Sequence, residues 1–119
     1  MHVIDHSTLP RHTDAGRQRF AAAAGRTEPL PFELWIDTLE INARAEVAPR
    51  DCHRVVLVSA GYGILQVDGA PQRFHAPCSL ILPPGVECLV VNVGAEAMRM
   101  VVVCGAAPPD APAAASRPG

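Results

Sequence analysis

Short apolar segments recur along most of this chain, and their spacing is the feature that most constrains its fold. The segments are rich in Val, Ile and Leu, and they follow one another between residues 32 and 104 at intervals of roughly ten residues. They are FELWI, LEINARAEV, VVLV, ILQV, SLIL, CLVVNV and MRMVVVC. The turn signals between them are Ala48-Pro49, Gly61-Tyr62-Gly63, Asp68-Gly69, Pro83-Pro84-Gly85 and Gly94. Short strands separated in this way predict an all-β sandwich or barrel.

Two local patterns add detail to this prediction. Asp68 and Gly69 separate ILQV from QRFHA, and because both residue types tolerate a positive φ, we expect a hairpin turn there. Residues 39–47 alternate between apolar and polar side chains. This alternation predicts one half-buried strand over the whole stretch.

The chain divides into three zones. Its 119 residues are the length of a single domain. Residues 1–31 are polar and interrupted by prolines near their end, so we expect an irregular N-terminal lead-in. Residues 32–104 are expected to form the barrel. Residues 105–119 are rich in Pro and Ala, have little to bury, and are expected to be a flexible tail.

Composition excludes several classes of partner. The net charge is −2, every basic residue except histidine is an arginine, and few residues are aromatic. A protein without a basic face or a base-stacking surface is not expected to bind nucleic acid. No apolar run approaches the ~20 residues that a membrane span needs, so we expect no membrane partner.

The cysteines indicate a compartment. They stand at positions 52, 78, 88 and 104 without a C-x-x-C pair, and most lie in apolar runs, where a reduced, buried thiol is expected. The N-terminus also lacks the basic-then-apolar order of a secretory signal. We therefore expect a cytoplasmic protein.

Two segments resemble a known family. RVVLVSAGYGILQVDG has Gly61 at the end of a G-x5-H-x-H-x3,4-E-x6-G pattern, and LILPPGVECLVVN has Pro83, Gly85 and Asn92 in a G-x5-P-x-G-x2-H-x3-N pattern. These are the two motifs of the cupins, and residues 32–104 resemble a small, RmlC-like cupin. The resemblance implies a cupin-type double-stranded β-helix, or jelly-roll barrel, and a homodimer.

The same motifs lack the residues with which cupins bind metal. The histidine positions fall on Ala48 and Arg50, or on Val47 and Pro49 with the longer spacer, and on Cys88, and the glutamate position falls on Arg54. A guanidinium group has no lone pair to give a divalent cation, and its charge repels one. We therefore expect no metal and no other cofactor at this site.

An inward-facing arginine suggests a different ligand. If Arg54 takes the orientation of the family's glutamate, alternation places Arg54, Val56 and Val58 inside the barrel and His53 and Val55 outside. A guanidinium group inside a small cavity suits a carboxylate or phosphate. We predict that the chain binds a small, acidic organic molecule. The expected ligand-binding residues are Arg50, Arg54, Val56, Cys88, Val90, Met98 and Met100, and no catalytic residue is predicted.

Two structural alternatives remain open at this stage. The two arginines could instead pair with carboxylates at the barrel mouth, namely Asp51, Glu46 or Glu87. A shift of one residue along the motif would turn His53 inward and leave Arg54 in solvent.

Two functional alternatives also remain open. Cys52, His53 and Cys88 could together hold Zn, Fe, Mn or Ni, as in a dioxygenase or isomerase with an unusual ligand set. The chain could otherwise be a structural or regulatory dimer. In that case Trp35 and its neighbours, on a strand at the sheet edge, would form the contact.

Overall fold

The computed structural model describes residues 3–23 and 31–105, which form ten strands and one short 3-10 helix, η1 (His6–Thr8). The strands are β1 (His12–Asp14), β2 (Arg17–Ala21), β3 (Phe32–Leu39), β4 (Arg44–Val47), β5 (Arg54–Ala60), β6 (Tyr62–Val67), β7 (Ala70–His75), β8 (Cys78–Leu82), β9 (Cys88–Asn92) and β10 (Met98–Gly105). All of the pairings between them are antiparallel. The prediction of an all-β fold is confirmed.

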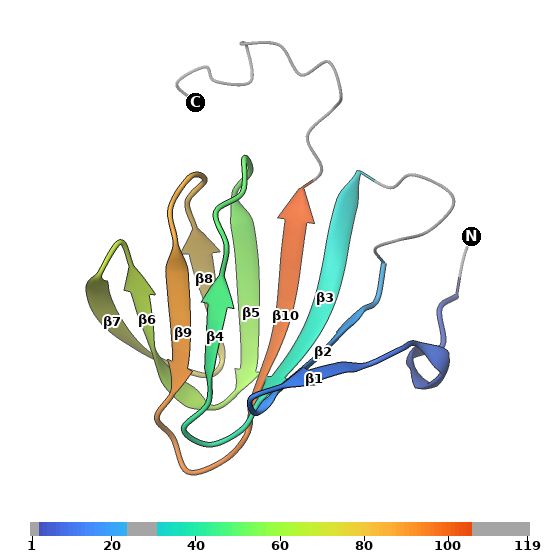
Figure 1. Ribbon diagram of the computed structural model, residues 1–119, viewed down its shortest axis with the longest axis horizontal. Coiled ribbons are helices and arrows are strands. Elements are labelled where there is room, and N and C mark those ends of the chain that lie inside the picture. Colours follow the sequence, from blue (N-terminus) through green and yellow to red (C-terminus); the bar gives the residue numbers. More distant parts are fainter. Residues whose placement is uncertain (1–2, 24–30, 106–119) are drawn as a thin grey trace.

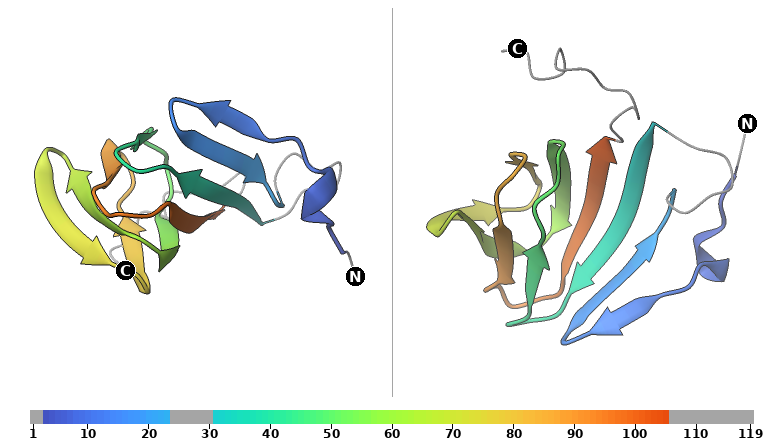
Figure 2. Two further views of the ribbon diagram at one scale, coloured as in Figure 1. Left: turned by 90° about the horizontal axis from the view of Figure 1, so that it is seen from below. Right: turned by 45° about the horizontal axis from the view of Figure 1, so that its top comes forward.

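The strands form two sheets (Figure 1). The larger sheet has the order β1-β2-β3-β10-β5-β8, and the smaller has the order β4-β9-β6-β7. The chain passes repeatedly from one sheet to the other, so strands that are neighbours in sequence often lie in different layers. Figure 2 shows that β1 and β2 extend the larger sheet past the edge of the smaller one.

Alternation along the strands builds the core between the two sheets. On β10, Met98, Met100, Val102 and Cys104 are buried, whereas Arg99 is exposed. This is the period of two that a strand imposes on its side chains. Most residues on the inner faces of both sheets are apolar for the same reason, and these apolar side chains form one continuous core.

Strand β5 has the orientation that the sequence predicts. Arg54, Val56 and Val58 are each 2% exposed, Val55 is half-buried and His53 is exposed. The alternative in which His53 turns inward is wrong, since a shift of one residue would reverse every side chain of the strand. The hairpin between β6 and β7 is also confirmed.

The predicted strand over residues 39–47 is wrong, because the chain turns in its middle. β3 ends at Leu39 and β4 begins at Arg44. Between them Asn42 has a φ of 67°, a left-handed conformation that asparagine tolerates. Ile41 is 50% exposed at this turn, although its apolar neighbours in the alternating pattern face the core.

Asn92, the asparagine of the second motif, stabilises this turn. Its buried side-chain amide donates to the carbonyl oxygens of Leu39, Glu40 and Glu96, and its side-chain oxygen accepts from the backbone N–H of Gly94. One side chain therefore joins the β3–β4 turn to the β9–β10 loop. The role of this motif residue is structural.

The prediction of an irregular lead-in is wrong for residues 12–21. β1 and β2 form a hairpin around Ala15 and Gly16, which have φ values of 48° and 84°, and β2 pairs with β3. A two-residue turn with positive φ at both positions suits an antiparallel hairpin. On the outer face of the sheet, Phe20 is buried beneath the guanidinium of Arg11, which lies 4.2 Å from the ring centroid.

The extra hairpin changes the position of β3. Since β3 lies between β2 and β10, it is an internal strand, and the prediction that the strand of Trp35 lies at a sheet edge is wrong. The homodimer itself stays a prediction. Of the expected tail, Gly105 ends β10 and residues 106–119 lie outside the described residues. Within the described part of the chain, no helix is long and apolar enough to cross a membrane.

Candidate functional site

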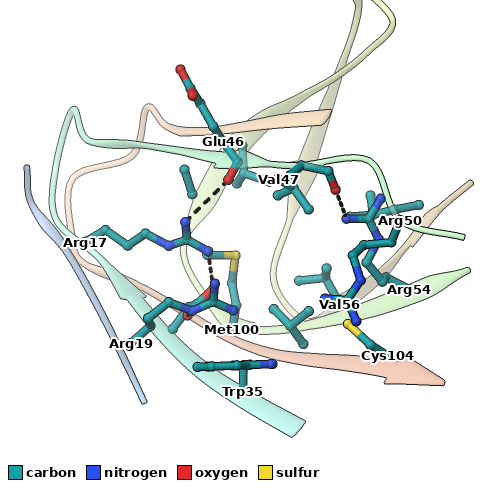
Figure 3. A pocket seen from close by; sticks show the side chains of 16 residues that line it. Arg17, Arg19, Trp35, Glu46, Val47, Arg50, Arg54, Val56, Met100 and Cys104 are labelled. Atoms are coloured by element: carbon teal, nitrogen blue, oxygen red, sulfur yellow. Dashed lines mark hydrogen bonds and ion pairs between the residues drawn. The ribbon is translucent and has the colours of Figure 1, made fainter. Parts of the chain in front are cut away.

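A cavity of about 210 Å³ lies between the two sheets (Figure 3). Its walls combine apolar side chains with four arginines. The lining residues are Arg17, Arg19, Trp35, Asp37, Ala45, Glu46, Val47, Ala48, Arg50, Arg54, Val56, Leu82, Val90, Met100, Val102 and Cys104. A small volume, apolar walls and a few polar groups are typical of a site for a small organic molecule.

Arg54 is the most deeply buried arginine of this cavity. It is 2% exposed, and its Nη1 donates to the carbonyl oxygen of Ala48. Its Nε and Nη2 atoms are buried and have no hydrogen-bond acceptor among the described residues. A buried donor without a partner costs about 1–3 kcal/mol, and more when the group is charged. The Nε and Nη2 atoms of Arg54 are therefore unsatisfied donors in the free protein.

Arg50 has a different environment at the mouth of the cavity. Its Nη2 lies 3.2 Å from Oε2 of Glu33, and the indole N–H of Trp35 donates to the other oxygen of Glu33 at 3.3 Å. The Arg50 side chain is 44% exposed. The alternative pairing with Asp51, Glu46 or Glu87 is wrong, because the inner face of β3 brings Glu33 to Arg50 instead.

A second group of charges lies on β2 and β3. Nη2 of Arg17 is 2.9 Å from Oδ2 of Asp37, and Nε of Arg19 is 3.0 Å from Oδ1. Asp37 is 1% exposed, whereas the Arg17 and Arg19 side chains are 19% and 29% exposed. Burial lowers the pKa of Arg19, and the charge of Asp37 opposes this shift. Arg17 also donates to the carbonyl oxygen of Glu46 at 3.4 Å and so joins the two sheets.

Trp35 connects the two groups of charges. Its indole ring lies beneath the guanidinium of Arg19, with 4.2 Å between Cζ and the ring centroid, while its N–H binds Glu33, the partner of Arg50. Figure 3 shows the ring on the wall of the cavity between the two ends. Trp35 therefore contacts a member of each group.

Sequence reasoning missed Arg17, Arg19, Trp35 and Asp37 as site residues. Arg17 and Arg19 are two residues apart, and so are Trp35 and Asp37. This spacing places the two side chains of each pair on one face of a strand. The pairing of β2 with β3 sets Arg19 directly opposite Asp37. The missing signal was the Ala15-Gly16 turn, which creates the hairpin and hence brings β2 to the site.

The expected ligand-binding residues divide into two sets. Arg50, Arg54, Val56, Val90 and Met100 line the cavity, whereas Cys88 and Met98 do not. Met98 is fully buried at the other end of β10, in the space left by Gly61 and Gly63. A Cβ atom on Gly63 would come within 2.6 Å of Met98 Cε. The assignment of Cys88 and Met98 to the cavity is therefore corrected, while binding by the other five stays a prediction.

The two buried thiols near the arginines are poor nucleophiles. Burial raises the pKa of Cys88, although the charge of Arg54 opposes the shift. Burial likewise raises the pKa of Cys104, which lines the cavity, against the opposing charges of Arg50 and Arg54. A thiol with a raised pKa stays protonated at neutral pH, and the thiolate is the reactive form.

The residues at the metal-binding positions do not fit a metal ion. Arg54 occupies the glutamate position and offers buried N–H donors, not lone pairs. Cys52 is half-buried, His53 is exposed and Cys88 is buried. In residues 3–23 and 31–105, no three His, Cys, Asp or Glu side chains come together as a metal site, so these three do not form one.

Solved structures similar to this one are cupins. A cupin 2 conserved barrel domain protein from Salinispora arenicola is 25% identical, with a TM-score of 0.71 over 90% of this chain and 88% of that chain. An RmlC-like cupin from Shewanella frigidimarina is 17% identical, with a TM-score of 0.73 over 92% of this chain and 95% of that chain.

A nucleoside dehydratase from Streptomyces is 14% identical, with a TM-score of 0.72 over 88% of this chain and 82% of that chain. At this identity the similarity concerns the fold alone. No protein-family model matches the sequence, and no curated protein matches it significantly. The structural matches extend over most of each chain, so they include the N-terminal hairpin region as well as the two motifs.

Proposed function

Because this chain is a small cupin domain with other residues at the metal-binding positions, we propose that it binds a small, acidic organic molecule in its barrel, with Arg54 as the anchor. The observation that carries this proposal is that Nε and Nη2 of Arg54 are buried without an acceptor in the part of the chain that the structure describes. A carboxylate can accept from two guanidinium N–H groups at once, in a planar and charge-assisted pair.

The rest of the cavity suits the organic part of such a molecule. Val56, Val90, Met100 and Val102 line it and carry no group that can hydrogen-bond. An apolar wall around one anionic anchor selects a small acid over inorganic anions, since burying its carbon atoms adds free energy. Arg50 lies nearby, but its charge is already paired with Glu33, so it is not the main anchor.

Binding can be followed through Trp35, the only tryptophan of the chain, which lines the cavity. We expect hexanoate and benzoate to change its fluorescence in a saturable way. The variant Arg54→Met should bind them roughly 100-fold more weakly, because it loses two charge-assisted hydrogen bonds. Arg44→Met, which removes an exposed arginine outside the cavity, is the matched control and should bind like the wild type.

Two results would contradict this proposal. One is an Arg54→Met variant that binds both acids as tightly as the wild type. The other is a wild-type protein that binds neither acid at concentrations where their solubility allows measurement. In either case the buried N–H groups of Arg54 would not be an anion site.

If this proposal is correct, the protein holds neither a catalytic nor a structural metal ion. Elemental analysis of untagged protein after dialysis should find metal far below one equivalent per chain. About one equivalent of Zn, Fe, Mn or Ni would overturn it and would favour a metal-dependent enzyme. Chelation would then reduce stability as well, since metal binding contributes to folding.

A further inference from the structure

The two groups of arginines lie at diagonally opposite corners of the larger sheet's inner face. Arg19 on β2 is opposite Asp37 on β3, which is opposite Met100 on β10 and then Val58 on β5. Arg54 lies four residues from Val58 on that strand. Strands about 4.8 Å apart and a rise of about 3.3 Å per residue place the two backbones on the order of 20 Å apart.

The long arginine side chains point into this space from both corners. Figure 3 shows Arg17 and Arg19 on one side of the cavity and Arg54 on the other, with Trp35, Val56 and Met100 between them. All of these side chains line the same cavity. It therefore has two cationic ends and an apolar middle.

Each end carries one positive charge that no carboxylate of the described residues balances. At the first end, Arg17 and Arg19 share the single carboxylate of Asp37. The carboxylate of Glu46 does not balance them, because it points away in Figure 3 and only its backbone carbonyl accepts from Arg17.

The second end has the same imbalance. Arg50 pairs with Glu33, and the one acceptor for Arg54 among residues 3–23 and 31–105 is the carbonyl oxygen of Ala48. A ligand with a single charge would balance one end and leave the other unbalanced. A ligand with a charge at each terminus would balance both, and an unbalanced charge in a partly buried site is unfavourable.

We propose that the ligand is a linear dicarboxylate whose two carboxylates are separated by an apolar spacer, with one carboxylate at Arg54 and the other at Arg17 and Arg19. This inference rests on the proposed function, since it takes Arg54 as the site of one carboxylate. The apolar middle binds the spacer by burial, and the distance between the ends selects its length.

The test compares dicarboxylates with monocarboxylates of equal chain length. Trp35 fluorescence is titrated with succinate and butanoate, glutarate and pentanoate, adipate and hexanoate, and pimelate and heptanoate. We expect the best dicarboxylate to bind roughly tenfold or more tightly than its monocarboxylate, because the second charge gains its own charge-assisted hydrogen bonds. We also expect one chain length to bind best.

Variants of Arg17 assign the second carboxylate to its end. Arg17→Gln leaves Arg19 paired with Asp37, so that end becomes neutral and the preference for the dicarboxylate should disappear, while the monocarboxylate still binds at Arg54. Arg17→Lys keeps the charge and should keep most of the preference. Arg44→Gln is the matched control. A thermal melt of each variant shows that it is folded.

The possible outcomes separate this inference from the proposed function. Equal binding of mono- and dicarboxylates by the wild type, or a preference unchanged in Arg17→Gln, overturns the dicarboxylate and leaves an Arg54-dependent monoacid site intact. If Arg17→Gln does not fold, the wild-type comparison and Arg17→Lys still decide. Binding that does not depend on Arg54 overturns both.

Discussion

The two ends of the cavity use arginine in opposite ways. Arg17 and Arg19 are partly exposed, yet both pair with the buried carboxylate of Asp37. Arg54 is almost completely buried, yet its Nε and Nη2 have no acceptor and it has no carboxylate partner among the described residues. The Nε of Arg17 also lacks an acceptor there, but Arg17 has Asp37 as its carboxylate partner. The first arrangement stabilises the fold by joining β2 to β3. The second costs stability in the free protein, and a bound acid would remove that cost.

The largest effect on stability is expected at the end of the cavity where Arg17 and Arg19 pair with Asp37. Asp37→Asn removes the one carboxylate that balances Arg17 and Arg19 and leaves two like charges side by side. We expect the free energy of unfolding to fall by about 2–3 kcal/mol, below the value for a fully buried pair because both arginines are partly exposed. Urea denaturation followed by circular dichroism measures this change.

Asp51→Asn is the control for this experiment. Asp51 is exposed and forms no ion pair among the described residues, so its change should leave stability within about 0.5 kcal/mol of the wild type. Equal effects of the two substitutions would show that the Asp37 pairs contribute no more than a surface charge does.

A change in the free energy of unfolding with the opposite sign is expected at the end of the cavity that contains Arg54. Arg54→Met replaces a buried, unpaired charge with an apolar side chain of similar length. We expect the free protein to be as stable as the wild type or more stable, by up to about 2 kcal/mol, even though ligand binding is lost. Differential scanning calorimetry without ligand tests this, with Arg44→Met as the control. A loss of more than about 1 kcal/mol would mean that Arg54 is satisfied in the folded protein.

The smallest expected effect is on the pH dependence of stability. It concerns the end of the cavity with Arg54 and Arg50, because the buried thiols lie near these two arginines. Folding raises the pKa of Cys88 and Cys104 by burial. Their protonated forms favour the folded state, so this contribution is complete below the unfolded thiol pKa of about 8.5 and is lost as pH rises through the folded value.

The double variant Cys88→Ala/Cys104→Ala should therefore lose less stability than the wild type between neutral and alkaline pH. Urea denaturation at a series of pH values measures both slopes. Parallel slopes for the two proteins would show that the thiols do not titrate differently in the folded and unfolded states. Comparing slopes cancels the constant cost of the cavities that the alanines leave.

Local sequence patterns predicted much of the barrel. The Asp68-Gly69 hairpin follows from turn chemistry, which depends on neighbouring residues only. The inward orientation of Arg54 follows from the resemblance to the cupin motif, which places Arg54 at the glutamate position, and from a period of two along the strand. The same period led to the wrong prediction of a single strand over residues 39–47. Alternation continued across the turn at Asn42, and nothing nearby in the sequence shows that Asn92 holds this turn in place.

The candidate site was predicted only at one end. Arg54 and Arg50 could be found because the motif spacing gives their positions in the barrel. Arg17, Arg19 and Asp37 could not, since their proximity depends on which residues of β2 and β3 pair. That pairing is set by the hairpin turn and by the burial of distant side chains, and no motif describes it.

By itself, the sequence determined the strand-rich fold, the loss of the metal-binding residues and the presence of an inward-facing arginine. These depend on residue type and on spacing along a single strand. Only the tertiary structure decided which charges are balanced. Glu33 pairs with Arg50, Asp37 pairs with Arg17 and Arg19, and Arg54 keeps free N–H groups, because strand pairing and packing bring together residues far apart in the chain.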